Sequence, residues 1–218
     1  MNGSLTVPGP HNGAALLTAG TPIADAQGAL VLIHGRGAAA EEMLDLARHF
    51  GAERFGWVAP QANGNTWYPF PFLAPIARNQ PDLDSALALL AAVTDQLAAD
   101  GIPYAKQVLI GFSQGACLSL EFAARSDRRW GGVIGLSGGV IGPDGTTWDR
   151  PPGIAGTPVF LGCSDVDPHI PVTRVHETRD LFTRIGAVVD ERIYPGMPHT
   201  INEDEIAAVR SLLAGVPR

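Results

Sequence analysis

The chain has 218 residues, of which 45% are hydrophobic and 17% charged, and its formal net charge is −7. This length and composition suit one globular domain spanning residues 1–218 and exclude a disordered chain. The net negative charge, without any run of lysine or arginine, argues against nucleic acid or an anionic membrane surface as a partner.

Segments typical of strands alternate with segments typical of helices along the chain. A strand near 15–18 comes first and is expected at the outer edge of a sheet. Further strands are expected at 29–34, 56–59, 107–110, 133–136, 158–161 and 188–193, and helices at 41–50, 83–99, 114–124, 172–185 and 203–213. Asp82 is the expected N-cap of the second helix. The alternation predicts an α/β fold with a mostly parallel sheet flanked by helices on both faces.

Three long loops follow predicted strands, at 60–81, 138–156 and 162–171. Ligands of open α/β sheets bind at the carboxyl ends of the strands, and all three loops leave strands at that edge. The interval between the strands at 133–136 and 158–161 is rich in glycine and proline and offers no helical pattern. We therefore expect an open pocket without a cap domain.

The segment Gly111-Phe112-Ser113-Gln114-Gly115 lies where a strand pattern becomes a helix pattern. It fits G-x-S-x-G, in which a nucleophilic serine sits on a strained strand-to-helix turn and small neighbours avoid collisions. An ordinary turn is the alternative, and the position between strand and helix favours the nucleophile. Ser113 is therefore the candidate nucleophile.

A serine hydroxyl needs a general base, and histidine is the usual one. His199 follows the last predicted strand and precedes the last helix, which places it at the same sheet edge as Ser113. The other five histidines fit less well. His11 lies in an N-terminal segment expected to be loose, His49 ends a helix, His176 lies within a helix, His169 directly follows the candidate acid and Pro168, and the backbone of His34 is expected to matter more than its ring.

The base needs a carboxylate that orients it and stabilises its cation. The segment after the strand at 158–161 offers Asp165 and Asp167. Asp167 precedes Pro168, which favours an extended conformation at a loop apex, so Asp167 is preferred. Asp165 is the second candidate, with capping of its own loop as the alternative role.

An oxyanion formed at Ser113 needs backbone donors. One candidate is the N–H of Gln114, the residue after the nucleophile, and the other is the N–H of Arg36 in the early loop His34-Gly35-Arg36-Gly37. The side chain of Arg36 has two interpretations: contact with an anionic part of a substrate, or solvation or pairing with a nearby acid.

Four segments together resemble the phospholipase/carboxylesterase family of α/β-hydrolases: HGRG at 34–37, GFSQGA at 111–116, SDVDPHIP at 164–171 and PGMPHTI at 195–201. The resemblance runs from about residue 29 to the C-terminus and implies the α/β-hydrolase fold. It implies Ser113 as nucleophile, Asp167 as acid, His199 as base, Gln114 and Arg36 as oxyanion donors, and no metal or organic cofactor. Arg36-Gly37-Ala38 and Trp67-Tyr68-Pro69 differ from the thioesterase branch, so the chain is more similar to bacterial esterases of small esters.

Aromatic residues gather in the loop at 60–81. Trp67, Tyr68, Phe70, Phe72 and Leu73 either wall a substrate pocket or pack the loop onto the body of the protein. The two cysteines, Cys117 and Cys163, read as buried free thiols, and no metal-ligand spacing is present.

The resulting prediction is a serine carboxylesterase that hydrolyses small-molecule esters with short to medium acyl groups. An acyl thioesterase or lysophospholipase, and a non-catalytic ligand-binding protein on the same fold, are the alternatives. The N-terminal residues lack the pattern of a secretory signal, and no apolar stretch approaches the roughly 18 residues of a membrane span. We expect a cytoplasmic protein, for which a homodimer is possible.

Overall fold

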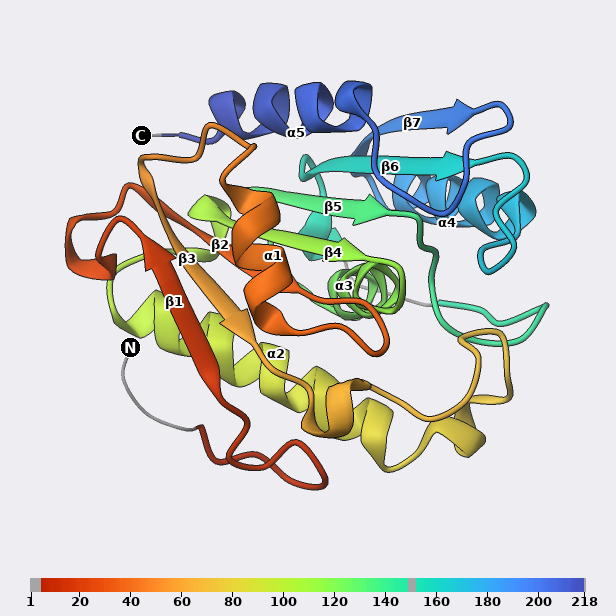
Figure 1. Ribbon diagram of the computed structural model, residues 1–218, viewed down its shortest axis with the longest axis horizontal. Coiled ribbons are helices and arrows are strands. Elements are labelled where there is room, and N and C mark those ends of the chain that lie inside the picture. Colours follow the sequence, from red (N-terminus) through yellow and green to blue (C-terminus); the bar gives the residue numbers. More distant parts are fainter. Residues whose placement is uncertain (1–4, 149–151, 218) are drawn as a thin grey trace.

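A computed structural model describes residues 5–148 and 152–217, which form a seven-stranded sheet covered by helices on both faces (Figure 1). The strand order is β1-β3-β2-β4-β5-β6-β7, and only β1 runs antiparallel to its neighbour. The strands are β1 (Leu16–Gly20), β2 (Gly28–Ile33), β3 (Phe55–Pro60), β4 (Gln107–Phe112), β5 (Gly132–Leu136), β6 (Pro158–Ser164) and β7 (Val188–Tyr194). The predicted α/β-hydrolase fold, with its edge strand β1, is confirmed.

The helices divide into two layers. The α-helices are α1 (Ala40–Ala47), α2 (Asp82–Ala99), α3 (Gln114–Ala124), α4 (Val172–Arg184) and α5 (Glu203–Gly215). Short 3-10 turns lie at Ile23–Asp25, Asn63–Asn65, Ile76–Asn79, Tyr104–Lys106 and Pro152–Ile154. One core packs α2, α3 and α4 against the sheet, and the other packs α1 and α5 against the opposite face (Figure 1). Alternate strand residues supply the two cores, as Val31 and Leu32 of β2 illustrate.

The observed elements differ from the predicted ones mainly at their ends. β4 and β6 extend to Phe112 and Ser164, so that the sheet reaches the turn bearing Ser113 and approaches the loop bearing Asp167. The predicted capping role of Asp82 is wrong. Asp82 is already the first helical residue of α2, and the side-chain oxygen of Gln80 accepts the N–H of Asp84 at 3.2 Å instead.

The N-terminal segment at 5–14 is packed against the body, contrary to the expectation that His11 is loose. The imidazole of His11 is buried, with Nε2 at 3.1 Å from the carbonyl oxygen of Trp67, and its Nδ1 accepts the N–H of Asn63 at 3.2 Å. The N–H of His11 also donates to Ser85 of α2 at 2.9 Å. This segment therefore connects α2 to the loop that follows β3.

The loop predicted at 138–156 lies partly outside the described residues, since 149–151 are not among them. In its described part only the 3-10 turn at Pro152–Ile154 forms, and the carbonyl oxygen of Phe72 accepts the N–H of Gly142 at 2.8 Å. Among the described residues, no helix is long and apolar enough to cross a bilayer.

Candidate active site

Ser113 occupies a strained turn between β4 and α3. Its φ of +55° and ψ of −119° lie outside the regions that L-residues usually adopt. A Cβ on Gly111 would collide with the carbonyl oxygen of Gly115, and a Cβ on Gly115 would collide with that of Ile33. Both glycines are therefore required by close backbone approach, and the turn holds the serine side chain clear of its own backbone.

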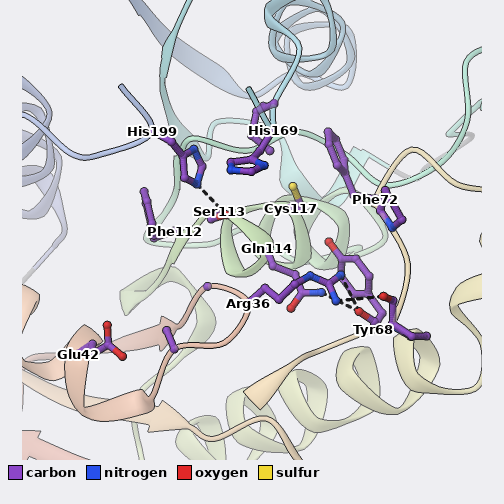
Figure 2. Close-up of a pocket in the computed structure, with 15 residues that line it drawn as sticks. Arg36, Glu42, Tyr68, Phe72, Phe112, Ser113, Gln114, Cys117, His169 and His199 are labelled. Carbon is purple, nitrogen blue, oxygen red and sulfur yellow. Dashed lines mark hydrogen bonds between the residues drawn. The ribbon is translucent and has the colours of Figure 1, made fainter. Parts of the chain in front are cut away.

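Ser113, His199 and Asp167 form a continuous hydrogen-bonded chain at one edge of the sheet. The Nε2 atom of His199 lies 3.0 Å from the Oγ of Ser113, and its Nδ1 lies 2.6 Å from an oxygen of Asp167 (Figure 2). With a proton on Nδ1, the imidazole donates to Asp167 and leaves Nε2 free to accept the serine proton. The predicted residues, 86 and 32 positions apart, are brought together.

The carboxylate of Asp167 is held in its charged form. Burial by itself would raise the pKa of Asp167, but the hydrogen bond with His199 and those from the backbone N–H groups of His169 and Ile170 outweigh it, so the pKa is lowered. The two N–H groups donate to the second carboxylate oxygen at 2.8 and 3.0 Å. Asp167 can therefore stabilise an imidazolium formed at His199.

Asp165, the second candidate for the acid, is directed elsewhere. Its carboxylate accepts the N–H of Gly196 at 2.7 Å, which ties the loop of Asp167 to the loop of His199. Asp165 thus braces the two loops and does not contact the imidazole.

Three other histidines, His169, His176 and His49, lie in or next to the elements where the sequence placed them, and His169 makes one contact that was not expected. The ring of His169 stands edge-on to that of His199, with centroids 4.9 Å apart, and lines the same pocket. His176 lies in α4, 2.8 Å from Glu191, and His49 lies at an exposed turn after α1. Sequence spacing gave no sign of the contact between His169 and His199.

The two candidate oxyanion donors flank Ser113. Within the described residues, neither the N–H of Gln114 nor that of Arg36 donates a hydrogen bond. Gln114 begins α3, where the helix dipole favours negative charge. Gly35, which precedes Arg36, lies against Ser113, since a Cβ there would be 3.5 Å from the serine Cβ.

The ring of His34 fixes the direction of the Arg36 N–H, so it has a structural role beside the one expected for the His34 backbone. Its Nδ1 lies 2.7 Å from the carbonyl oxygen of Gly35, and its Nε2 accepts the N–H of Ala62 at 3.0 Å. Because C=O and N–H point in opposite directions in a trans peptide, holding the Gly35 oxygen also aims the Arg36 N–H. Burial lowers the pKa of His34, which keeps the ring neutral, as these contacts require.

The side chain of Arg36 lies at an exposed position but pairs with no acid among the described residues, because its guanidinium binds a neighbouring loop. Its Nη1 donates to Thr66 Oγ1 and the Pro69 carbonyl at 3.0 and 3.1 Å, and its Nη2 donates to the carbonyls of Tyr68 and Phe70 at 2.9 and 3.1 Å. All four terminal N–H bonds of the guanidinium are thus committed to one loop.

The side chain of Gln114 binds the same loop through two hydrogen bonds. Its oxygen accepts the N–H of Trp67 at 3.0 Å, and its nitrogen donates to the carbonyl of Tyr68 at 2.8 Å. Both candidate oxyanion donors are therefore anchored to residues 66–70 through their side chains. We define this segment, Thr66–Phe70, as the anchor loop.

The aromatic residues of the loop at 60–81 divide between the two predicted roles. Tyr68 and Phe72 line the pocket above Ser113 (Figure 2). Trp67 does not: it is fully buried, and its indole N–H donates to the His34 carbonyl at 2.8 Å. Phe70 is 37% exposed and lies under the guanidinium of Arg78, away from the pocket lining. The predicted substrate contacts of Trp67 and Phe70 are therefore corrected.

The pocket has a volume of about 650 Å³ and is bordered mainly by apolar groups. Cys117 forms part of its wall, which the sequence did not predict. Burial raises the pKa of the Cys117 thiol to about 12, and that of Cys163 likewise, so neither is a thiolate nucleophile at neutral pH. Across the described ranges, no group of three or more His, Cys, Asp or Glu side chains is placed to hold a metal ion.

Comparison with known proteins identifies the family. The phospholipase/carboxylesterase family model matches residues 18–216. Acyl-protein thioesterase 1 of Debaryomyces hansenii is 30% identical over 61% of this chain and 57% of its own length, and that of Candida albicans is 33% identical over 53% and 52%. The matches thus span only about half of the length of these curated relatives.

Solved structures agree with this family. A phospholipase/carboxylesterase from Dyadobacter fermentans is 39% identical, with a TM-score of 0.89 over 98% of this chain and 100% of that one. Esterase PE8 shares the fold, with a TM-score of 0.76 at 23% identity, over 94% of this chain and 99% of that one. The family model covers residues 18–216, which include the turn that bears Ser113 and the whole sheet apart from the first two residues of β1. The protein therefore belongs to the phospholipase/carboxylesterase family of α/β-hydrolases.

Proposed function

We propose that the protein is a serine carboxylesterase that hydrolyses small-molecule esters with short to medium acyl groups. The observation that carries the proposal is the hydrogen-bonded chain from Ser113 through His199 to Asp167 beneath an open, largely apolar pocket. Membership of a hydrolase family supports the reaction class.

In the proposed mechanism His199 takes the proton of Ser113 as the serine oxygen attacks the ester carbonyl carbon. The N–H groups of Gln114 and Arg36 stabilise the oxyanion of the tetrahedral intermediate. His199 then gives the proton to the leaving alcohol, and the acyl group stays on Ser113. Water attacks the acyl-enzyme with His199 as base, which releases the acid and restores the serine hydroxyl. No step requires a metal or an organic cofactor.

The substrate range follows from the shape of the site. Tyr68, Phe72 and Cys117 form an apolar wall on one side of Ser113, which suits an acyl group (Figure 2). A pocket of about 650 Å³ that no helical cap covers in the described residues suits short and medium chains. A thioesterase is the second candidate, because curated relatives about 30% identical are acyl-protein thioesterases.

The proposal extends to the setting of the enzyme: a single domain of residues 1–218 that acts in the cytoplasm. One sheet shared by both helical layers supports a single domain. Over the described surface, the exposed large apolar side chains are Phe70, Val166 and Val188. Val166 follows β6 and Val188 begins the parallel β7, so these two lie at opposite ends of the sheet and provide little support for the homodimer considered from the sequence.

Labelling by a fluorophosphonate tests the assignment of the nucleophile. Wild type should be labelled and should hydrolyse p-nitrophenyl butyrate, whereas Ser113→Ala should do neither. Ser119→Ala is the control, since Ser119 is buried in α3 and bonded to the Gly115 carbonyl, and it should keep labelling. Labelling that persists in Ser113→Ala would refute the proposal. A series of acyl chain lengths, as oxygen esters and as acyl-CoA thioesters, separates the esterase from the thioesterase.

A further inference from the structure

The leaving group of an ester must lie beside His199, because Nε2 of that ring delivers the proton to the departing oxygen. Phe112 marks this side of the site, since its ring packs against that of His199 with centroids 5.0 Å apart. Figure 2 shows Phe112 and Glu42 on one side of Ser113, and Tyr68 and Phe72 on the other. The acyl group and the leaving group therefore meet different walls.

A second, smaller pocket continues from the leaving-group side. It has a volume of about 150 Å³ and shares Gly35, Ala38, Glu42 and Phe112 with the main pocket. Beyond them it is bordered by His34 and by the apolar side chains of Met43, Leu46 and Ile201. Its volume equals that of about five water molecules, which is enough for a short branched alkyl or ammonium group.

Glu42 gives this end of the site an unpaired negative charge. Its side chain is exposed, and one oxygen accepts the N–H of Ala39 at 2.9 Å, at the start of α1. The other oxygen has no partner, and no basic side chain pairs with Glu42 among the residues that the structure describes. Arg36, which also borders the main pocket, directs its guanidinium to the anchor loop and away from Glu42 (Figure 2).

We propose that the pocket of Ala38, Met43, Leu46, Phe112 and Ile201 is a leaving-group subsite, and that Glu42 at its rim makes it selective for esters of cationic or neutral alcohols over anionic ones. The proposal rests on the serine esterase function above and names its alcohol specificity. An apolar wall with one carboxylate suits a quaternary or primary ammonium alcohol, whose alkyl surface and charge are both matched.

Three butyrate esters with leaving groups of similar size test the proposal: the cationic choline ester, the neutral 3,3-dimethylbutyl ester and the anionic 2-sulfoethyl ester. The measured quantity is kcat/KM of each charged ester divided by that of the neutral ester. Glu42→Gln should lower the cationic ratio about three-fold or more and should raise the anionic ratio similarly, as expected for one charge a few ångströms away in a wet site. About 1 M salt should shrink both effects.

Glu41→Gln is the matched control, because Glu41 lies in the same first turn of α1 but borders neither pocket. It should change the ratios less than Glu42→Gln does. Equal changes in both variants, or ratios in Glu42→Gln that match wild type, would overturn the proposal. Leu46→Phe narrows the subsite and should reduce hydrolysis of the 3,3-dimethylbutyl ester relative to methyl butyrate, and an equal effect on both esters would contradict the assigned pocket.

These outcomes separate the inference from the proposed function. One outcome is that wild type hydrolyses the neutral ester, Ser113→Ala does not, and Glu42→Gln leaves the kcat/KM ratios of the charged esters unchanged. In that case the proposed esterase function is supported and the proposed subsite is wrong. If no Ser113-dependent hydrolysis of any ester occurs, the proposed function fails and the subsite fails with it.

Discussion

Glu205 is a carboxylate without solvent exposure, next to the loop that bears His199. One of its oxygens accepts the N–H of Asn202 at 2.8 Å, and the other lies against Gly162 of β6 and has no hydrogen-bond partner among the described residues. Burial raises the pKa of Glu205 to about 7, although the Asn202 N–H opposes the shift. Above neutral pH the Glu205 carboxyl is therefore ionised while buried, which is unfavourable for the folded state.

This placement predicts how stability depends on pH. Because the folded pKa lies above the unfolded value, the folded state binds more protons between about pH 4.5 and 7, so stability falls as pH rises through that window. Glu205→Gln should therefore be more stable than wild type at pH 8, by an amount on the order of 2 kcal/mol, and the difference should vanish below about pH 4.5. Urea unfolding at several pH values measures it.

Glu203→Gln is the control for this prediction. Glu203 lies in the same first turn of α5 but is exposed, so its replacement should leave the pH profile nearly unchanged. A parallel profile for Glu205→Gln and wild type would contradict the assigned protonation.

Residue patterns pointed to the candidate residues of the hydrogen-bonded chain because each of them has its own local signal. Ser113 lies between glycines, Asp167 precedes a proline, and His199 follows the last strand. No local signal in the sequence indicated how the side chains that position these residues and the loops around them are oriented. Arg36 and His34 act through contacts with residues about 30 positions away, and only folding reveals those acceptors.

At the scale of elements, the anchor loop is the part that connects the two residues proposed as oxyanion donors. The Arg36 guanidinium and the Gln114 amide both bind this loop, and the indole N–H of Trp67 in the loop donates to the His34 carbonyl at 2.8 Å. Helices and strands were predictable because the spacing of apolar residues in the local sequence indicates which face of each element is buried. The anchor loop was not predictable, because its irregular backbone is held by the side chains of Arg36, in the loop after β2, and Gln114 of α3.

Trp67→Phe tests whether the anchor loop positions the oxyanion donors. The variant removes the indole N–H and leaves the buried His34 carbonyl without that donor. We expect kcat for p-nitrophenyl butyrate to fall about ten-fold, as a partial loss of one donor would cause, with KM little changed. Steady-state kinetics and the rate of phosphonate labelling measure the effect.

Trp130→Phe separates positioning from simple loss of packing. Trp130 is equally buried, but its indole N–H has no hydrogen-bond partner in the described part of the chain, and the residue packs against Tyr104 and Phe122 away from the pocket. It should lose stability and keep kcat. If both variants lose kcat equally, the anchor loop has no special role in orienting the donors.

At the scale of the whole molecule, the topology explains why residues so distant in sequence converge. β4, β6 and β7 are parallel, so the turns after them, which carry Ser113, Asp167 and His199, emerge at one edge of the sheet (Figure 1). That edge was predictable from the alternation of strands and helices. The packing of the N-terminal segment was not predictable, because its glycine- and proline-containing sequence has no periodicity and only its contacts with α2 and the loop after β3 order it.

His11→Ala tests whether this N-terminal segment supports the site from a distance. The variant removes buried hydrogen bonds to the Trp67 carbonyl and the Asn63 N–H, at a cost of roughly 1–3 kcal/mol, or a fall in Tm of several degrees for a chain of this size. Since Trp67 belongs to the anchor loop, kcat should fall along with Tm. Thermal unfolding and steady-state kinetics measure the two effects, with the exposed His49→Ala as control. A stable His11→Ala variant with unchanged kcat would show that the loop keeps its geometry without the N-terminal segment, and that the side chains of Arg36 and Gln114 are sufficient to hold it.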